Sequence, residues 1–89
     1  MGPKEAIGPN NYLVIWPVGE IKELNEGYAV AEFAPGLILF GGDGGDKAYA
    51  FDTRSDELPI VEVPLVGMDI SLAKQCGATF KNFLEYLSQ

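Results

Sequence analysis

The stretch from Pro35 to Arg54 constrains the fold of this chain more than any other. It contains two apolar, β-prone runs joined by six residues that are all glycine or aspartate, Gly41-Gly42-Asp43-Gly44-Gly45-Asp46. Glycine adopts a positive φ without steric penalty, and aspartate hydrogen-bonds its own backbone in turns. The pattern predicts a β-hairpin whose loop serves either as a plain structural turn or as a contact with a partner.

Two segments before the hairpin have clear patterns. The continuous apolar run at residues 12–16 predicts a strand that is covered on both faces and stops at Pro17. Ile21 and Leu24 stand three residues apart among charged residues, which predicts a short helix near residues 18–26 with one apolar side. The order at this point is therefore a strand and then a helix.

The remaining segments outside the C-terminus add strands. Alternation at residues 28–33 predicts a strand, and residues 59–66 predict a short or edge strand because proline at both ends lacks the N–H that a ladder needs. Residues 67–77 fit either a short strand or a loop. Residues 1–11 carry prolines and glycines without periodicity, so we expect a loose leader followed by a single domain over residues 12–89.

The C-terminus carries the clearest helical pattern. Its apolar residues recur at helical spacing and are Ala78, Phe80, Phe83, Leu84 and Leu87. This spacing predicts an amphipathic helix near residues 78–87 that covers one face of the sheet. Taken together, the patterns predict an α+β fold, with a mostly antiparallel sheet of about five strands, a central β-hairpin, the short helix and the C-terminal helix.

Acidic residues dominate the charge of the chain. It has 13 Asp and Glu against 6 Lys and Arg, which gives a net charge of −7, and most of the excess lies between residues 20 and 57. Such a balance disfavours binding to a nucleic-acid backbone. It favours a basic protein partner, because opposite charges steer the encounter.

Few residues offer chemistry. The chain has no histidine, and its single cysteine, Cys76, has no recognisable base near it in sequence. The glycine-aspartate run fits the Gly-Gly-x-Gly-x-Asp unit of calcium-binding β-rolls, but one copy offers too few ligands. We therefore expect no catalytic residue, no metal and no cofactor. Without a signal segment or a long apolar run, a cytoplasmic protein is expected, with no membrane partner.

Aromatic residues and carboxylates have two interpretations. A tryptophan at a strand end, such as Trp16, either fills the core or lines a groove for a partner, and the core is the commoner outcome; the same holds for Tyr49. Scattered carboxylates most often form a solvated face.

The order of several motifs resembles the SUKH superfamily, which includes fungal cell-wall-synthesis regulators and bacterial immunity proteins that neutralise toxins. The resemblance covers roughly residues 12–87 and rests on Ile15-Trp16, Glu20-Ile21, Asn25, Tyr28, Pro35-Gly36-Leu37, Phe40-Gly41-Gly42-Asp43-Gly44-Gly45, Tyr49-Ala50-Phe51-Asp52, Thr79-Phe80 and Phe83-Leu84. It implies an α+β fold and a non-enzymatic binding role, often against nuclease or deaminase toxins.

One departure from the family concerns the N-terminus. Family members usually begin with helices that precede the tryptophan strand, whereas eleven residues stand in that place here. A sheet face that those helices would cover is then left partly bare. We therefore expect a homodimer or a higher oligomer.

These observations predict an immunity-type or adaptor-type protein that binds a basic partner, such as a nuclease toxin. The candidate contact residues are Trp16, Glu20, Glu23, Asp43, Asp46, Tyr49, Asp52 and Asp56. The alternative is a module that binds a cation or a small molecule through the glycine-aspartate loop at an oligomer interface. An enzyme would need a carboxylate pair that the sequence does not reveal.

Overall fold

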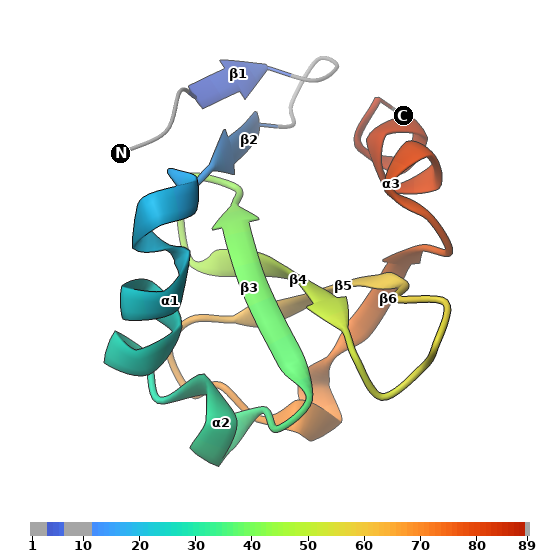
Figure 1. Ribbon diagram of the computed structural model, residues 1–89. Coiled ribbons are helices and arrows are strands. Elements are labelled where there is room, and N and C mark those ends of the chain that lie inside the picture. The colour runs from blue at the N-terminus through green and yellow to red at the C-terminus, as the bar shows by residue number, and fades with distance from the viewer. Residues whose placement is uncertain (1–3, 7–11, 89) are drawn as a thin grey trace.

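The computed structural model describes residues 4–6 and 12–88. Over these residues, six strands form one sheet in which each strand pairs antiparallel with the next along the chain (Figure 1). The strands are β1 (Lys4–Ala6), β2 (Tyr12–Ile15), β3 (Leu37–Gly42), β4 (Lys47–Asp52), β5 (Ile60–Pro64) and β6 (Lys74–Gly77). The helices are α1 (Val18–Gly27), α2 (Val30–Phe33), the 3-10 helix η1 (Ile70–Leu72) and α3 (Phe80–Leu87). The predicted α+β class with an antiparallel sheet is confirmed.

The sheet has an apolar cluster on each face. Alternate residues of β3, β4 and β5 point to one face, where they pack with Val30 of α2 and with α1. The other face carries Tyr49, Ile60 and Cys76, and α3 covers it with Phe83 and Leu87. The sheet therefore lies between α2 on one side and α3 on the other.

A β-bulge in β3 shifts its pairing with β4 by one residue. Leu39 pairs with Ala50, and the next paired residue, Gly41, stands opposite Tyr49, so Phe40 is the extra residue. Leu39 belongs to the cluster beside α2, whereas Phe40 belongs to the cluster under α3. Two consecutive apolar residues are thus both buried, because successive side chains point to opposite faces and both faces are covered.

The predicted strand at residues 28–33 is wrong. Tyr28 ends α1, Ala29 adopts a left-handed conformation with φ of 54°, and Val30–Phe33 form α2. Val30 and Ala34, four residues apart, are buried, which is helical spacing. Over six residues rich in alanine, the two periodicities are too similar to separate by pattern.

Part of the predicted leader also differs from expectation. Residues 4–6 form β1, which pairs with β2 from Lys4 opposite Val14 to Ala6 opposite Tyr12. The rest of residues 1–11 lies outside the described residues. The segment at 67–77, which the sequence left open, contains η1 and then β6.

The glycine-aspartate run divides between a strand and a turn. Gly41 and Gly42 belong to β3 and stand opposite Ile15 and Val14 of β2. A Cβ on Gly41 would collide with the carbonyl oxygen of Val14. The turn itself covers residues 43–46, where Asp43 Oδ1 accepts hydrogen bonds from the backbone N–H of Gly45 at 2.8 Å and of Lys47 at 3.2 Å.

Candidate functional site

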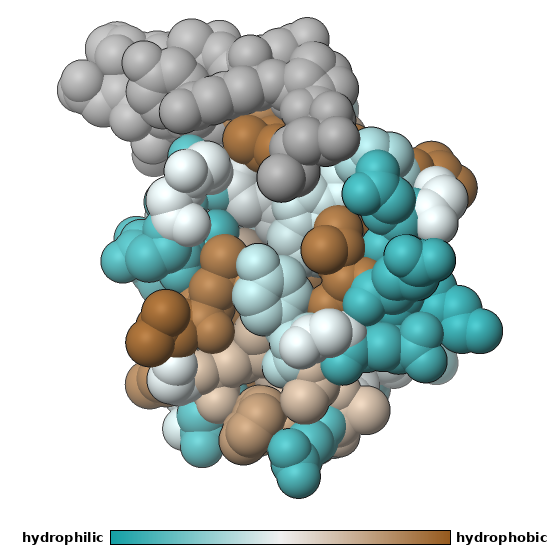
Figure 2. Space-filling view, turned by 90° about the vertical axis from the view of Figure 1, so that its left-hand side faces the viewer, coloured by the Kyte–Doolittle hydropathy of each residue, from teal (hydrophilic) through white to brown (hydrophobic). Residues whose placement is uncertain are grey.

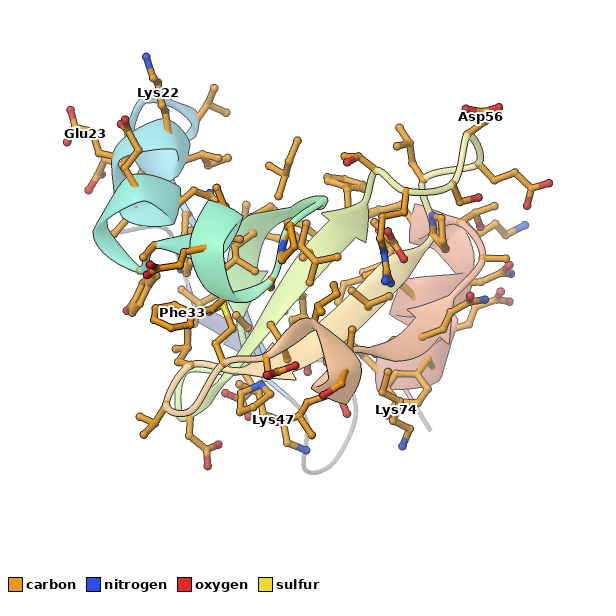
Figure 3. The ribbon with its side chains drawn as sticks, turned by 90° about the horizontal axis from the view of Figure 1, so that it is seen from below. Lys22, Glu23, Phe33, Lys47, Asp56 and Lys74 are labelled. Carbon is orange, nitrogen blue, oxygen red and sulfur yellow. The ribbon has the colours of Figure 1, made fainter. Side chains whose placement is uncertain are left out.

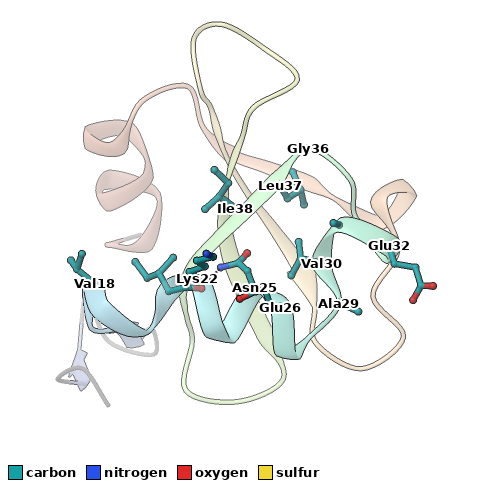
Figure 4. Close-up of a pocket in the computed structure, with 12 residues that line it drawn as sticks. Val18, Lys22, Asn25, Glu26, Ala29, Val30, Glu32, Gly36, Leu37 and Ile38 are labelled. Atoms are coloured by element: carbon teal, nitrogen blue, oxygen red, sulfur yellow. Dashed lines mark hydrogen bonds between the residues drawn. The ribbon is translucent and has the colours of Figure 1, made fainter.

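An open groove of about 770 Å3 lies between α1, α2 and the first half of β3 (Figure 4). Most of its lining is apolar or small, and three charged residues stand among these. The lining residues are Val18, Ile21, Lys22, Asn25, Glu26, Ala29, Val30, Ala31, Glu32, Gly36, Leu37 and Ile38. A concave, largely apolar surface of this size suits a ligand or a partner segment.

The path of the chain after β2 creates the groove. Pro17 ends the strand, and the last bond from this segment to β3 runs from Trp16 N–H to the Phe40 carbonyl at 2.9 Å. From there α1 departs and runs beside β3 where a longer β2 would have continued (Figure 1). The first half of β3 therefore faces a helix instead of a strand.

Three backbone groups on the edge of β3 that faces α1 are hydrogen-bonded. Asn25 of α1 accepts a hydrogen bond from Leu39 N–H at 2.8 Å through Oδ1, and its Nδ2 donates to the Leu39 carbonyl at 2.9 Å. Leu37 N–H donates to the Ala34 carbonyl at 3.1 Å. These bonds close the strand edge along the wall of the groove.

The apolar floor of the groove continues toward α3. Ile38, which is 47% exposed, stands directly opposite Phe51 of β4. The ring of Phe51 lies 4.8 Å from that of Phe40, which lies 5.9 Å from the ring of Phe80 at the start of α3. Phe80 is 41% exposed. We call the surface formed by Val18, Ile38, Phe51 and Phe80 the open apolar face.

Acidic residues stand on the two helices that border the groove. Of the five charged residues on α1 and α2, only Lys22 is basic, and the acidic ones, all exposed, are Glu20, Glu23, Glu26 and Glu32. The ion pairs among the described side chains join Lys47 to Glu62 and Arg54 to Asp52. The carboxylates of α1 and α2 therefore belong to neither pair. Figure 2 shows the side of the molecule that carries α1, where hydrophobic side chains are open to solvent between hydrophilic ones.

The two aromatic candidates from the sequence are core residues. Trp16 is only 7% exposed and stacks on Tyr28 with ring centroids 6.1 Å apart. Tyr49 is 4% exposed, and burial raises the pKa of its hydroxyl. Neither ring is presented to a partner, and the core interpretation describes both.

Asp52, a third candidate, is buried and paired. Its Oδ1 accepts from Arg54 Nε at 2.9 Å, and its Oδ2 accepts from the terminal guanidinium nitrogen at 2.8 Å. These hydrogen bonds from Arg54 hold the pKa of Asp52 below its usual value. The Asp52 carboxylate therefore holds the loop after β4 instead of facing a partner.

The other acidic candidates are dispersed. Asp43 and Asp46 lie in the turn between β3 and β4, whereas Asp56 lies in the connection between β4 and β5, at the opposite end of the strands. Figure 3 shows Glu23 and Asp56 on opposite sides of the molecule. The structure thus brings Glu20 and Glu23 together on α1 and separates them from Asp56.

The sequence did not reveal the groove residues. Val18 and Ile38 appeared as ordinary members of a helix and of an apolar strand, yet Val18 is 88% exposed. Ile38 lies outside the cluster that α3 covers and is 47% exposed, and no local pattern encodes this placement. No signal in the sequence marked Ile38, because its equally apolar neighbours Leu37 and Leu39 point to the opposite, covered face.

The described part of the chain offers little for metal binding or nucleophilic catalysis. No three His, Cys, Asp or Glu side chains gather there in a way that could hold a metal ion. Cys76 is buried, and burial raises the pKa of its thiol to about 12, so it is a poor nucleophile. Asp43 uses one carboxylate oxygen within its own turn. None of the helices described is long and apolar enough to cross a membrane.

Comparison with known proteins adds no relative: no family model matches the chain, and neither does any curated protein sequence.

Proposed function

We propose that this chain is a non-enzymatic binding protein that neutralises or regulates a basic protein partner, as the SUKH-type immunity proteins that it resembles do. The observation that carries the proposal is the set of exposed carboxylates on α1 and α2, which belong to neither ion pair of the described side chains and stand beside an open apolar groove. A partner with basic residues would find both charge complementarity and apolar surface in one place.

The proposal narrows the contact surface predicted from the sequence. It keeps Glu20 and Glu23 and adds Glu26 and Glu32, which border or line the groove. It no longer includes Trp16, Tyr49 and Asp52 as partner contacts, because their side chains are buried. We further propose that the protein works without cofactor or catalysis and acts in the cytoplasm, where a single unpaired cysteine such as Cys76 is ordinary.

Electrostatic steering gives this kind of site a measurable signature. Exposed charges attract a partner over about one Debye length, roughly 10 Å at 0.1 M salt, so association slows as salt rises. The net charge of −7 strengthens the attraction at every orientation. We therefore expect the association rate with the partner, more than the dissociation rate, to depend on ionic strength.

The test is a growth assay in which the chain is co-expressed with a toxin domain encoded beside its gene. The double variant Glu23→Lys/Glu26→Lys reverses charge on α1 and should abolish protection. The matched control, Asp56→Lys/Glu57→Lys, makes the same change in charge in the exposed loop after β4 and should still protect. Equal protection by both double variants would show that the acidic face of α1 is not the binding surface.

A further inference from the structure

We infer that the groove and the open apolar face receive an amphipathic α-helix of the partner, with one apolar ridge and lysine or arginine residues along its flanks. This inference rests on the proposed function and specifies what part of a basic partner is recognised. Three observations carry it: the closed edge of β3, the arrangement of exposed apolar side chains, and the sign of the charges beside them.

The hydrogen bonds already made by the edge of β3 disfavour an extended peptide. A strand that adds to a sheet gains its affinity from backbone hydrogen bonds with a free edge. Here Asn25 occupies both backbone groups of Leu39, and the Ala34 carbonyl occupies Leu37 N–H. An extended segment in the groove would bury backbone groups without partners. A helix satisfies its own backbone hydrogen bonds and needs only side-chain contacts.

The exposed apolar side chains suit the ridge of such a helix. Val18 and Ile38 line the groove beside α1, and Phe51 and Phe80 continue the surface toward α3. In Figure 1, α1 and α3 stand on either side of β3. A helix lying over β3 would pack against side chains from both of these helices, as apolar anchors at helical spacing do in helix-in-groove complexes.

The acidic residues beside the groove favour a helix with basic residues on its flanks. They disfavour a second copy of this chain as the occupant. Glu26 and Glu32 line the groove with Lys22 as the only base, so lysine or arginine at the edge of the ridge would pair with carboxylates that lie outside the two ion pairs of the described side chains. A second copy would bring another net charge of −7 to the same surface. Like charges across an interface oppose association.

The experiment uses the full chain and three synthetic peptides of identical leucine and lysine content, with affinities measured by isothermal titration calorimetry. The first peptide places leucine at helical spacing to form one ridge, the second alternates leucine and lysine in the strand pattern, and the third disperses leucine around the helix. We expect the first to bind at least tenfold more tightly than the other two and to gain helical circular dichroism on binding.

Two substitutions locate the site. Ile38→Glu places a charge on the open apolar face and should weaken the first peptide at least tenfold. Leu72→Glu is the matched control, because Leu72 is 53% exposed against 47% for Ile38 and does not line the groove. The control should leave the affinity unchanged. Thermal unfolding of both variants checks that each remains folded.

The outcomes separate the inference from the function on which it rests. Equal affinity for all three peptides, or preference for the strand pattern, would overturn the helical occupant and leave a basic partner in place. Failure of the parent chain itself to protect in the growth assay would overturn the proposed function. The parent chain could instead form a stable dimer, bind none of the peptides, and become a monomer on Ile38→Glu. This result would show that the face joins two copies, in line with the oligomer expected from the sequence, and would overturn the inference.

Discussion

The side-chain amide of Asn25 hydrogen-bonds both backbone groups of Leu39, with Oδ1 accepting at 2.8 Å and Nδ2 donating at 2.9 Å. This is the pair of bonds that a neighbouring strand would make. Nδ2 also donates to the Ile21 carbonyl at 2.7 Å, so the amide ties α1 to β3. One polar side chain thus replaces the missing half of β2 and holds one wall of the groove.

Asn25→Ala should lower the free energy of unfolding by about 2 kcal/mol, because it leaves the partly buried N–H and carbonyl of Leu39 without partners. Asn82→Ala is the control, since Asn82 is exposed and its amide reaches only Glu85, at 3.2 Å. The control should change stability by less than about 0.5 kcal/mol. Urea unfolding measures both, and equal losses would contradict the role of Asn25.

Gly41→Ala should destabilise the domain by about 2–3 kcal/mol, because its Cβ would overlap the Val14 carbonyl and push β2 away from β3. Gly45→Ala provides the comparison within the same run, since a Cβ there would lie 3.4 Å from Asp43 Oδ1, an ordinary contact. Thermal unfolding should show a large drop for the first variant and almost none for the second. Similar drops would mean that both glycines serve the turn.

Asp52→Asn should lower stability by about 1 kcal/mol at neutral pH, because it removes the charged acceptor of the Arg54 guanidinium, which is half exposed. The folded-state pKa of Asp52 lies below its usual 3.8, so the native protein holds this carboxylate ionised more strongly than the unfolded chain does. Its contribution is complete above that value and is lost as pH falls through the lowered pKa.

Acid titration of stability checks this prediction. The difference between the parent chain and Asp52→Asn should be constant near neutrality and should shrink below about pH 4. Asp46→Asn, at an exposed position in the turn after β3, is the control and should change stability at neutral pH by less than about 0.5 kcal/mol. A difference that grows in acid would contradict the assigned sign.

Cys76 should make the domain lose stability in alkali. Burial raises the pKa of its thiol from 9.0 to about 12, so between these values the unfolded chain releases a proton that the native state keeps. The contribution of the thiol is therefore complete below pH 9 and declines as pH rises toward 12. Cys76→Ala should lose stability less steeply over this range, and a thiol reagent at pH 8 should label the parent chain only after urea unfolds it. Rapid labelling of the native chain would contradict the burial of Cys76.

Periodicity over long segments predicted much of this molecule. The class and the antiparallel sheet followed from apolar runs that a small chain must bury, such as residues 47–52 and 59–66. The segment at 28–33 was misassigned because Ala29 takes a left-handed conformation that alanine seldom adopts, and this conformation starts α2. Strand β1 was not predicted, because its residues show no alternating pattern of apolar and polar side chains, although its backbone pairs with β2.

The candidate site was less predictable because it depends on tertiary placement. The excess of acidic residues was visible in the sequence. Whether Glu23 and Asp56 lie on one surface depends on the tertiary arrangement of α1 and of the loop between β4 and β5, which the sequence pattern does not give. The apolar half of the site was hidden, because Ile38 is indistinguishable in sequence from its buried neighbours Leu37 and Leu39. Leu37 and Leu39 are covered by α1 and α2 on one face, whereas Ile38 points to the other face and lies outside the cluster that α3 covers.

The connection between β2 and β3 has a consequence for the order in which the structure opens. Every other pair of neighbouring strands from β2 onward is joined by a shorter connection, whereas β2 and β3 are separated by residues 16–36, which contain α1 and α2. Closing a longer loop costs more chain entropy, so β3 to β6 should assemble before β2 and α1 dock. We therefore expect amide hydrogen exchange to be faster in α1 than in β4, and a wall of the groove to detach while the central strands remain paired.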